Sequence, residues 1–199
     1  MTIRSALCGL VLTAWMLAWG GLVRAETGAA TPAPAASPAA SPAASPAASS
    51  PLVVQVGILL LNVGRLDTST GTYTMDFYLT MRCDRPCDPE PFELANGRIT
   101  FQQLQEQLPN YKAFRMQAAL SVGMDLRRYP FDKHQLGLVI EDSNRDAGSL
   151  VYVADTTRSL IATDLQVAGW ELSPGIHTRV EPHYYSIFDQ TYSHYFASV

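Results

Sequence analysis

The sequence has few charged residues, and its basic residues are scattered. Lysine and arginine contribute 14 of the 199 residues against 18 aspartates and glutamates, which gives a formal net charge of −4. Nowhere do basic residues gather into a patch or a run. Because an acidic surface repels the phosphates of DNA and RNA, we do not expect a nucleic-acid partner.

Cysteine is also scarce, with 3 in the whole chain. Cys8 lies in the apolar N-terminal run, which leaves Cys83 and Cys87 with three residues between them. For such a pair in an exported protein, a disulfide is favoured over two free thiols. A metal centre would need further ligands, and no second cysteine pair exists to supply them.

Motifs for metal binding and catalysis are missing as well. The four histidines are His134, His177, His183 and His194. They lack the spacing of metal ligands, so scattered surface histidines are the better interpretation. Asp132 and Ser143 flank His134 in sequence, but no Gly-x-Ser-x-Gly motif supports a hydrolase triad. We therefore expect no enzymatic activity, no cofactor and no metal.

What the chain does contain falls into three parts. Residues 1–25 hold a long apolar run that closes on Val23-Arg24-Ala25, the layout of a secretory signal cleaved after Ala25. An uncleaved membrane anchor is the alternative, since the run is near the lower limit for a membrane span. Residues 26–51 repeat serine, proline and alanine, which is typical of an extended tether without a core. Residues 52–199 remain as the folded domain.

The folded domain has the sequence pattern of β-strands. From Val53 to Leu66 the chain is rich in valine, isoleucine and leucine, and residues 67–71 are a turn signal. Apolar and polar residues then alternate from 72 to 82, and a second long alternation runs from 114 to 127. Shorter strands are predicted at 136–140, 149–154, 166–172, 176–181 and 192–199.

One short helix is predicted over residues 100–108. Thr100 and Gln103 fit a capping box, and Pro109 would end the helix. The apolar residues of this segment share one helical face: Phe101, Leu104 and Leu108. Many strands with a single helix indicate an all-β fold, either a sandwich or a barrel.

One segment carries a family resemblance. Residues 125–141 read Asp-Leu-Arg-Arg-Tyr-Pro-Phe-Asp-Lys-His-Gln-Leu-Gly-Leu-Val-Ile-Glu. This segment resembles the signature of the Cys-loop receptor superfamily, which includes the nicotinic receptors and the bacterial pentameric ligand-gated ion channels. Weaker matches follow the family order at Phe77–Asp84, Phe92–Gly97, Gly169–Leu172 and Tyr192–Val199. The resemblance covers residues 52–199 and implies an immunoglobulin-like β-sandwich of about ten strands with one short helix.

Departures from the family pattern favour its bacterial branch. The cysteines that bracket the signature loop in animal receptors would fall near Val122 and Leu136, and neither is cysteine, as in bacterial members. Arg82 or Cys83 stands where an aromatic residue is usual. No transmembrane helices follow the last expected strand, so we expect a C-terminally truncated chain without its pore domain.

The resemblance implies a coupling loop at Tyr129, Pro130, Phe131 and Asp132. In the family this loop lies at the bottom of the extracellular domain, rests on the pore domain and helps to transmit ligand binding. A well-packed turn without any role in gating is the alternative, because proline fixes φ and aspartate accepts turn hydrogen bonds.

The resemblance also implies a ligand site near the last two strands. Aromatic rings there would face an amine: Tyr184, Tyr185, Phe188 and Tyr192. Glu141 and Asp142 would supply negative charge. Ordinary strand aromatics and solvated turn carboxylates are the alternatives. An anionic ligand would instead need arginines such as Arg82 or Arg115.

Three hypotheses for function follow from these observations. The first is the extracellular ligand-binding domain of a ligand-gated ion channel, a homopentamer with a small-molecule ligand at its subunit interfaces and a membrane pore domain in the full-length protein. The second is a free-standing soluble ligand-binding β-sandwich of the periplasm, and the third is a structural or adhesive β-sandwich without a small ligand. In each case the chain would be secreted across the inner membrane, and the channel would present this domain on the periplasmic face of the cell membrane.

The N-terminal pattern gives a first prediction. Mass spectrometry of the exported chain should find its N-terminus at Glu26, because the small residue Ala25 closes the apolar run. A membrane-bound chain that retains residues 1–25 would contradict the cleaved signal and support the anchor.

Overall fold

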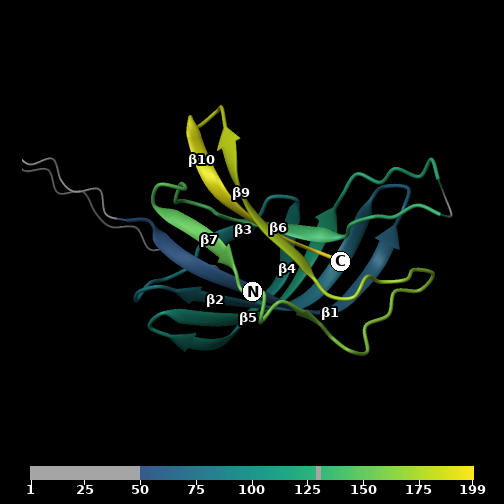
Figure 1. Cartoon of the computed structure of the whole chain (residues 1–199), viewed down its shortest axis with the longest axis horizontal. Coiled ribbons are helices and arrows are strands. Elements are labelled where there is room, and N and C mark those ends of the chain that lie inside the picture. The colour runs from purple at the N-terminus through teal and green to yellow at the C-terminus, as the bar shows by residue number, and fades with distance from the viewer. Residues whose placement is uncertain (1–49, 129–130) are drawn as a thin grey trace, which may run out of the picture. The chain divides into compact units, whose positions relative to one another are not determined.

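The computed structural model describes residues 50–128 and 131–199, which form ten β-strands and no helix (Figure 1). Sheet A has the order β4-β5-β2-β1-β7, with β8 pairing with β1. Its strands are β1 (Leu52–Asp67), β2 (Thr72–Cys83), β4 (Gly97–Leu108), β5 (Tyr111–Ser121), β7 (Leu150–Ala154) and β8 (Leu160–Ile161). Sheet B has the order β3-β6-β10-β9. Its strands are β3 (Phe92–Leu94), β6 (Gly137–Asp142), β9 (His177–Tyr185) and β10 (Gln190–Ser198).

The all-β class is therefore confirmed for the described part of the chain. Within that part, no helix is long and apolar enough to cross a membrane. The expected signal segment and most of the tether, residues 1–49, lie outside the described residues, and so do Tyr129 and Pro130.

The two sheets share one hydrophobic core, the arrangement of a β-sandwich. The predicted alternation of β2 is confirmed, because every second residue from Tyr73 to Met81 is buried. Sheet B closes the core with Leu138, Ile140 and Tyr195. Rings from the two sheets meet edge to face where Phe92 of β3 contacts Phe114 of β5, with their centroids 5.6 Å apart.

Polar side chains also join the two sheets. The Tyr73 hydroxyl of β2 donates to the carbonyl of Gly137 and accepts from its N–H at 2.9 Å. The Asn96 side chain donates to the same carbonyl and accepts from the Val139 N–H, both at 2.9 Å. Ser193 of β10 accepts from the N–H of Tyr152 in β7 at 3.0 Å. These bonds fix β6 and β10, the strands that carry the candidate site, against sheet A.

The helix predicted over residues 100–108 is wrong, because this segment lies within β4. β4 pairs with β5 from Gly97, opposite Leu120, to Leu108, opposite Tyr111. Phe101, Leu104 and Leu108 are all exposed, so no helical face is buried. Local capping signals are weak compared with a continuous ladder of backbone hydrogen bonds to a neighbouring strand, and the ladder decides the conformation here.

The predicted strand over 114–127 ends earlier than expected. β5 stops at Ser121, which pairs with Thr72, the first residue of β2. Beyond this point β2 offers no backbone partner, so the alternation that continues to Arg127 does not form a strand.

Residues 166–172 also fail to form the strand that was predicted. One isolated bridge joins Val167 to Trp170, and Gly169 between them has a φ of 83°. A positive φ reverses the chain direction over a few residues, so the apolar residues here belong to a tight turn.

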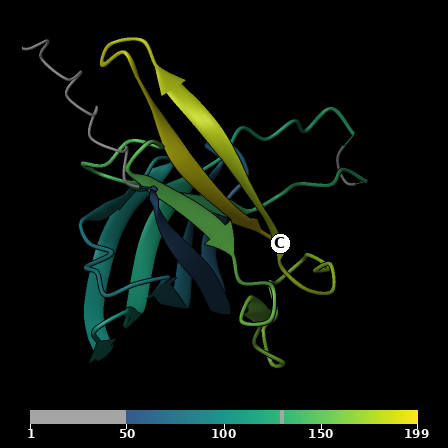
Figure 2. The same cartoon turned by 60° about the vertical axis from the view of Figure 1, so that its left-hand side comes forward.

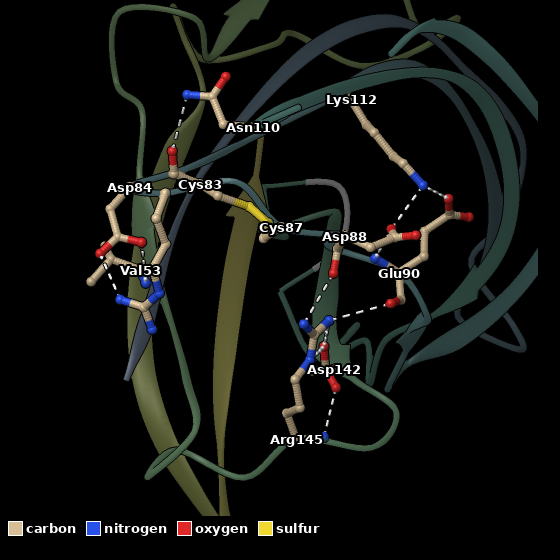
Figure 3. The surroundings of a disulfide bond; sticks show 11 residues. Val53, Cys83, Asp84, Cys87, Asp88, Glu90, Asn110, Lys112, Asp142 and Arg145 are labelled. Carbon is tan, nitrogen blue, oxygen red and sulfur yellow. Dashed lines mark hydrogen bonds and ion pairs between the residues drawn. A yellow bond between two sulfur atoms is a disulfide. The ribbon is translucent and has the colours of Figure 1, made fainter. Parts of the chain in front are cut away.

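A buried lysine holds the segment that follows the disulfide by pairing with two more exposed carboxylates. Cys83 and Cys87 form the expected disulfide. Just beyond it, the Lys112 ammonium contacts Asp88 at 2.7 Å and Glu90 at 2.6 Å, and the Lys112 side chain is buried. The hydrogen bond from Lys112 holds the pKa of the Asp88 carboxyl below its usual range. Figure 3 shows Lys112 reaching across to these two residues.

Lys112→Met should lower the free energy of unfolding by about 1–2 kcal/mol at neutral pH, because two carboxylates lose their common cation while solvent screens part of the loss. Since the pKa of Asp88 is depressed in the folded state, its contribution is present above the ordinary carboxyl pKa and is lost as the pH falls. The difference between variant and wild type should therefore shrink in acid.

Denaturant titrations at neutral and acid pH measure both effects. Lys133→Met is the matched control, since Lys133 is the other lysine of the chain and is exposed. Equal stability of Lys112→Met and Lys133→Met at neutral pH would contradict a stabilising role for the buried lysine.

Candidate functional site

Glu141, near the end of β6, is the centre of a buried polar cluster. Glu141 as a residue is 6% exposed, and its carboxylate accepts hydrogen bonds from the hydroxyl of Tyr185 at 3.0 and 3.1 Å. The Nε2 atom of His194 lies 2.7 Å from the same carboxylate. Because β6, β10 and β9 are neighbours in sheet B, their pairing brings these three side chains together.

The cluster lies on the outer face of sheet B. Ile140 and Tyr195, which point into the core, are the immediate neighbours of Glu141 and His194, so strand alternation turns the latter two to the opposite face. Glu93 of β3 pairs across the sheet with Glu141 and joins this face. We call the group on this face the acidic–aromatic cluster: Glu93, Glu141, His183, Tyr185, Tyr192 and His194.

Aromatic rings cover the carboxylate from the side of the β9–β10 hairpin. The His183 and His194 rings stack nearly parallel with their centroids 4.4 Å apart. Tyr185 meets Tyr192 edge to face at 5.7 Å and Phe188 at 6.2 Å. Figure 2 shows the tip of this hairpin, in yellow, projecting away from sheet A.

The cluster is acidic, and the arginine on the same face, Arg179, pairs with Glu181 and stacks on Phe196. Neither Glu141 nor Glu93 forms an ion pair with a lysine or arginine among the described residues. Burial and the neighbouring Glu141 raise the pKa of the Glu93 carboxyl. Burial lowers the pKa of His194 although Glu141 opposes this, which favours a neutral imidazole. Burial and Glu141 raise the pKa of Tyr185 to about 12, so its hydroxyl remains a donor.

The structure brings together Glu141, Tyr185, Phe188 and Tyr192 among the residues proposed for the ligand site. The Asp142 carboxylate has a different role, because its oxygens are already occupied. The Arg145 guanidinium contacts it at 2.6 Å, and the N–H groups of Asn144 and Arg145 donate to it. This carboxylate holds a turn, and its charge is already neutralised.

Two aromatic residues near the hairpin have other contacts. Tyr184 lies on the other face of β9 from Tyr185 and donates to Asp189 at 2.8 Å. Tyr195 is fully buried in the core, with its hydroxyl 3.4 Å from that of Ser159. Neither side chain belongs to the acidic–aromatic cluster.

The arginines considered for an anionic ligand lie on sheet A, away from this cluster. The Arg82 guanidinium lies over the Tyr111 ring at 4.9 Å from its centroid, and Arg115 lies over Tyr78 at 5.1 Å. Arg115 also contacts Asp76 at 3.5 Å. Each guanidinium is stacked on its own tyrosine, so the two do not converge on a common anion.

The described half of the predicted coupling loop has one exposed and one buried residue. Phe131 is 88% exposed. Asp132 contacts His134, and both of these side chains are buried. The His134 ring meets Trp170 edge to face at 5.6 Å, which ties this loop to the 166–172 turn.

Sequence reasoning missed His183, His194 and Glu93. The expectation that the histidines are scattered on the surface is wrong for His134 and His194, whose side chains are buried in contact with a carboxylate. A hairpin pairing of β9 with β10 would have placed His183 and His194 on one face, but its register is not evident from the sequence alone. Among the described residues, no three histidine, cysteine or acidic side chains are arranged to hold a metal ion.

The lowered pKa of His194 predicts a pH dependence. Since this imidazole accepts a proton less readily when folded than when unfolded, its contribution to stability is present above the ordinary histidine pKa and is lost as the pH falls. His194→Gln, which cannot be protonated, should therefore show a smaller loss of stability than wild type between pH 7 and the folded-state pKa.

Urea midpoints measured across this range test the effect, with His177→Gln as the control because His177 is exposed. An acid-induced loss of the same size in wild type and His194→Gln would show that His194 does not carry the transition.

Comparison with known proteins gives no information on the function of this chain. No protein-family model and no curated protein matches the chain. The function must therefore be inferred from the acidic–aromatic cluster itself and from the loop that contains Phe131.

Proposed function

We propose that this domain binds a small organic cation, such as an amine, at the acidic–aromatic cluster. The observation that carries the proposal is the Glu141 carboxylate, which is buried among aromatic rings and has no lysine or arginine partner among the described residues. An ammonium group would supply the missing charge and further hydrogen-bond donors.

The rings around Glu141 suit the same ligand. Tyr185, Tyr192 and Phe188 offer π-faces or edges beside the carboxylate. Each cation–π contact contributes roughly 0.5–2 kcal/mol, and most where water is excluded. The arginines of sheet A are already stacked on tyrosines, which favours a cation over an anion as ligand.

At the level of the whole protein, the proposal is the extracellular domain of a bacterial pentameric ligand-gated ion channel with an immunoglobulin-like sandwich. The sequence Tyr129-Pro130-Phe131-Asp132 supports it. So does the exposure of Phe131, which leaves an aromatic side chain free to contact another domain while Asp132 anchors the loop through His134. Ligand binding in a homopentamer would favour one arrangement of these loops and thereby bias the pore on the periplasmic side of the membrane.

A free-standing periplasmic ligand-binding protein of the same fold is the second candidate. The acidic–aromatic cluster would serve this protein equally well, because the cluster requires only sheet B and its hairpin. The reading frame distinguishes the two, since four apolar spans after Val199 belong to a channel and a stop codon belongs to a soluble protein.

A thermal-shift screen of matched primary amines and carboxylates tests the ligand class. Amines should raise the melting temperature, because a ligand that binds the folded state stabilises it. Glu141→Gln should weaken amine binding roughly tenfold to hundredfold, since a charge-assisted hydrogen bond becomes a neutral one.

Glu171→Gln is the matched control, because Glu171 is exposed and lies outside the cluster. The screen should be repeated on the assembled protein, where a neighbouring subunit can complete the site. Stabilisation by carboxylates alone, with Glu141→Gln behaving as wild type, would reject the cation site.

A further inference from the structure

The two cysteines of the disulfide differ in exposure. Cys83 is 2% exposed at the end of β2, while Cys87 is partly exposed. Cys87 lines a hollow of about 700 Å³ together with Asp88, Gln107, Leu108, Pro109 and Lys112. A small molecule in this hollow would therefore meet Cys87, whereas Cys83 is buried at the end of β2.

Contacts lead from this disulfide to the candidate ligand site. Arg145 donates to the backbone carbonyl of Asp88, the residue after Cys87, at 3.0 Å and to that of Glu90 at 3.4 Å. Its Nε atom donates to Asp142 at 2.8 Å. Asp142 is the neighbour of Glu141 in β6, and Figure 3 shows Arg145 lying between Asp142 and the segment after Cys87.

The strand after this segment adds a second connection. Only five residues separate Cys87 from Glu93, and β3 pairs Phe92 with Asp142 and Glu93 with Glu141. The position of the 84–91 segment thus affects both carboxylates of the acidic–aromatic cluster.

We propose that the Cys83–Cys87 disulfide is a site of thiol–disulfide exchange, attacked at Cys87 by a small thiol, and that its opening loosens the Arg145–Asp142 contact beside Glu141. The exchange site itself does not depend on the proposed function. Its consequence for ligand affinity rests on the amine site described above.

The reaction is balanced without any further reagent. A thiolate attacks Sγ of Cys87, the Cys83–Cys87 bond breaks, a mixed disulfide forms on Cys87, and Cys83 leaves as a thiolate that takes a proton from water. A second thiol attacks the mixed disulfide and releases Cys87 as a thiol and the two small thiols as their own disulfide. The protein gains two electrons, and the small thiols lose them.

Charge around the hollow selects the class of thiol. Asp88 and Glu90 together outweigh the single charge of Lys112, so the local charge is negative. A neutral thiol should therefore react faster than an anionic one of similar size. Access decides which sulfur is attacked, although the buried Cys83 is the poorer leaving group.

Two measurements on the full chain test the proposal, with Cys8→Ser as the background so that no other cysteine competes. The chain is treated with 2-mercaptoethanol or 2-mercaptoethanesulfonate, quenched in acid and mapped by mass spectrometry. At least about tenfold more adduct is expected on Cys87 than on Cys83, with faster reaction of the neutral thiol. Adduct mainly on Cys83, or no reaction with either thiol, would overturn the exchange site.

Hydrogen exchange then follows the turn that Arg145 holds. The amides of Asn144 and Arg145, which donate to Asp142, should exchange about tenfold faster after reduction. A matching turn serves as the internal control, because the amides of Thr157 and Arg158 donate to Asp155 in the same way. Their exchange should be unchanged by reduction.

Arg145→Met completes the design, since it breaks the link without touching the disulfide. In this variant the backbone amides of residues 144 and 145 should already exchange rapidly before reduction, and reduction should not accelerate them further. If reduction accelerated amide exchange equally in both turns of the wild type, the cause would be general loosening and the proposed link would be overturned. An unchanged exchange rate of the Asn144 amide would overturn it as well. Neither readout requires a ligand, so an absence of amine binding would reject the proposed function and leave this inference to be judged by adduct and exchange alone.

Discussion

A strand in a sandwich has one face for the core, and this constraint fixes what the other face of sheet B can carry. In β6 and β10 the core face holds Leu138, Ile140, Tyr195 and Ala197. The alternate residues are free from that requirement and can hold charge. Since β3, β6, β10 and β9 are consecutive neighbours, one outer face collects Glu93, Glu141 and His194 from segments distant in sequence. The apolar core thus determines where the acidic–aromatic cluster can exist.

Burying Glu141 would be costly without donors, and the sheet supplies them from the hairpin. Tyr185 donates to both oxygens of the carboxylate, and His194 contacts one of them. The Tyr185 hydroxyl and the His194 imidazole solvate the carboxylate without neutralising it. The raised pKa of Tyr185 and the lowered pKa of His194 both favour the neutral form of the side chain. Glu93 adds a second carboxylate nearby. Under the proposed function, a bound cation would supply the positive charge that these buried carboxylates lack.

Much of the fold could be predicted because strand alternation is a local signal. It identified β2, separate strands were predicted at 176–181 and 192–199 where β9 and β10 lie, and the pair Cys83 and Cys87 in an expected exported chain indicated their disulfide. The helix at 100–108 failed because pairing with β5 is not visible in the segment itself. Glu93 and His194 were missed for a related reason, since their meeting depends on the order and register of four strands. Glu141 and Tyr185 were found only through the family resemblance.

Two turns of this chain pair a carboxylate with an arginine, in contrast to Glu141. Asp142 and Asp155 each accept from the backbone of their turn, and each contacts an arginine three residues later, Arg145 at 2.6 Å and Arg158 at 3.0 Å. At these two turns an arginine neutralises the carboxylate, whereas Asp67 holds its own turn through Ser69 and Thr70. Glu141 is adjacent to Asp142 and is also buried, yet its contacts are a phenol and an imidazole. An arginine beside Glu141 would neutralise the buried carboxylate, and under the proposed function it would occupy the place of the cationic ligand.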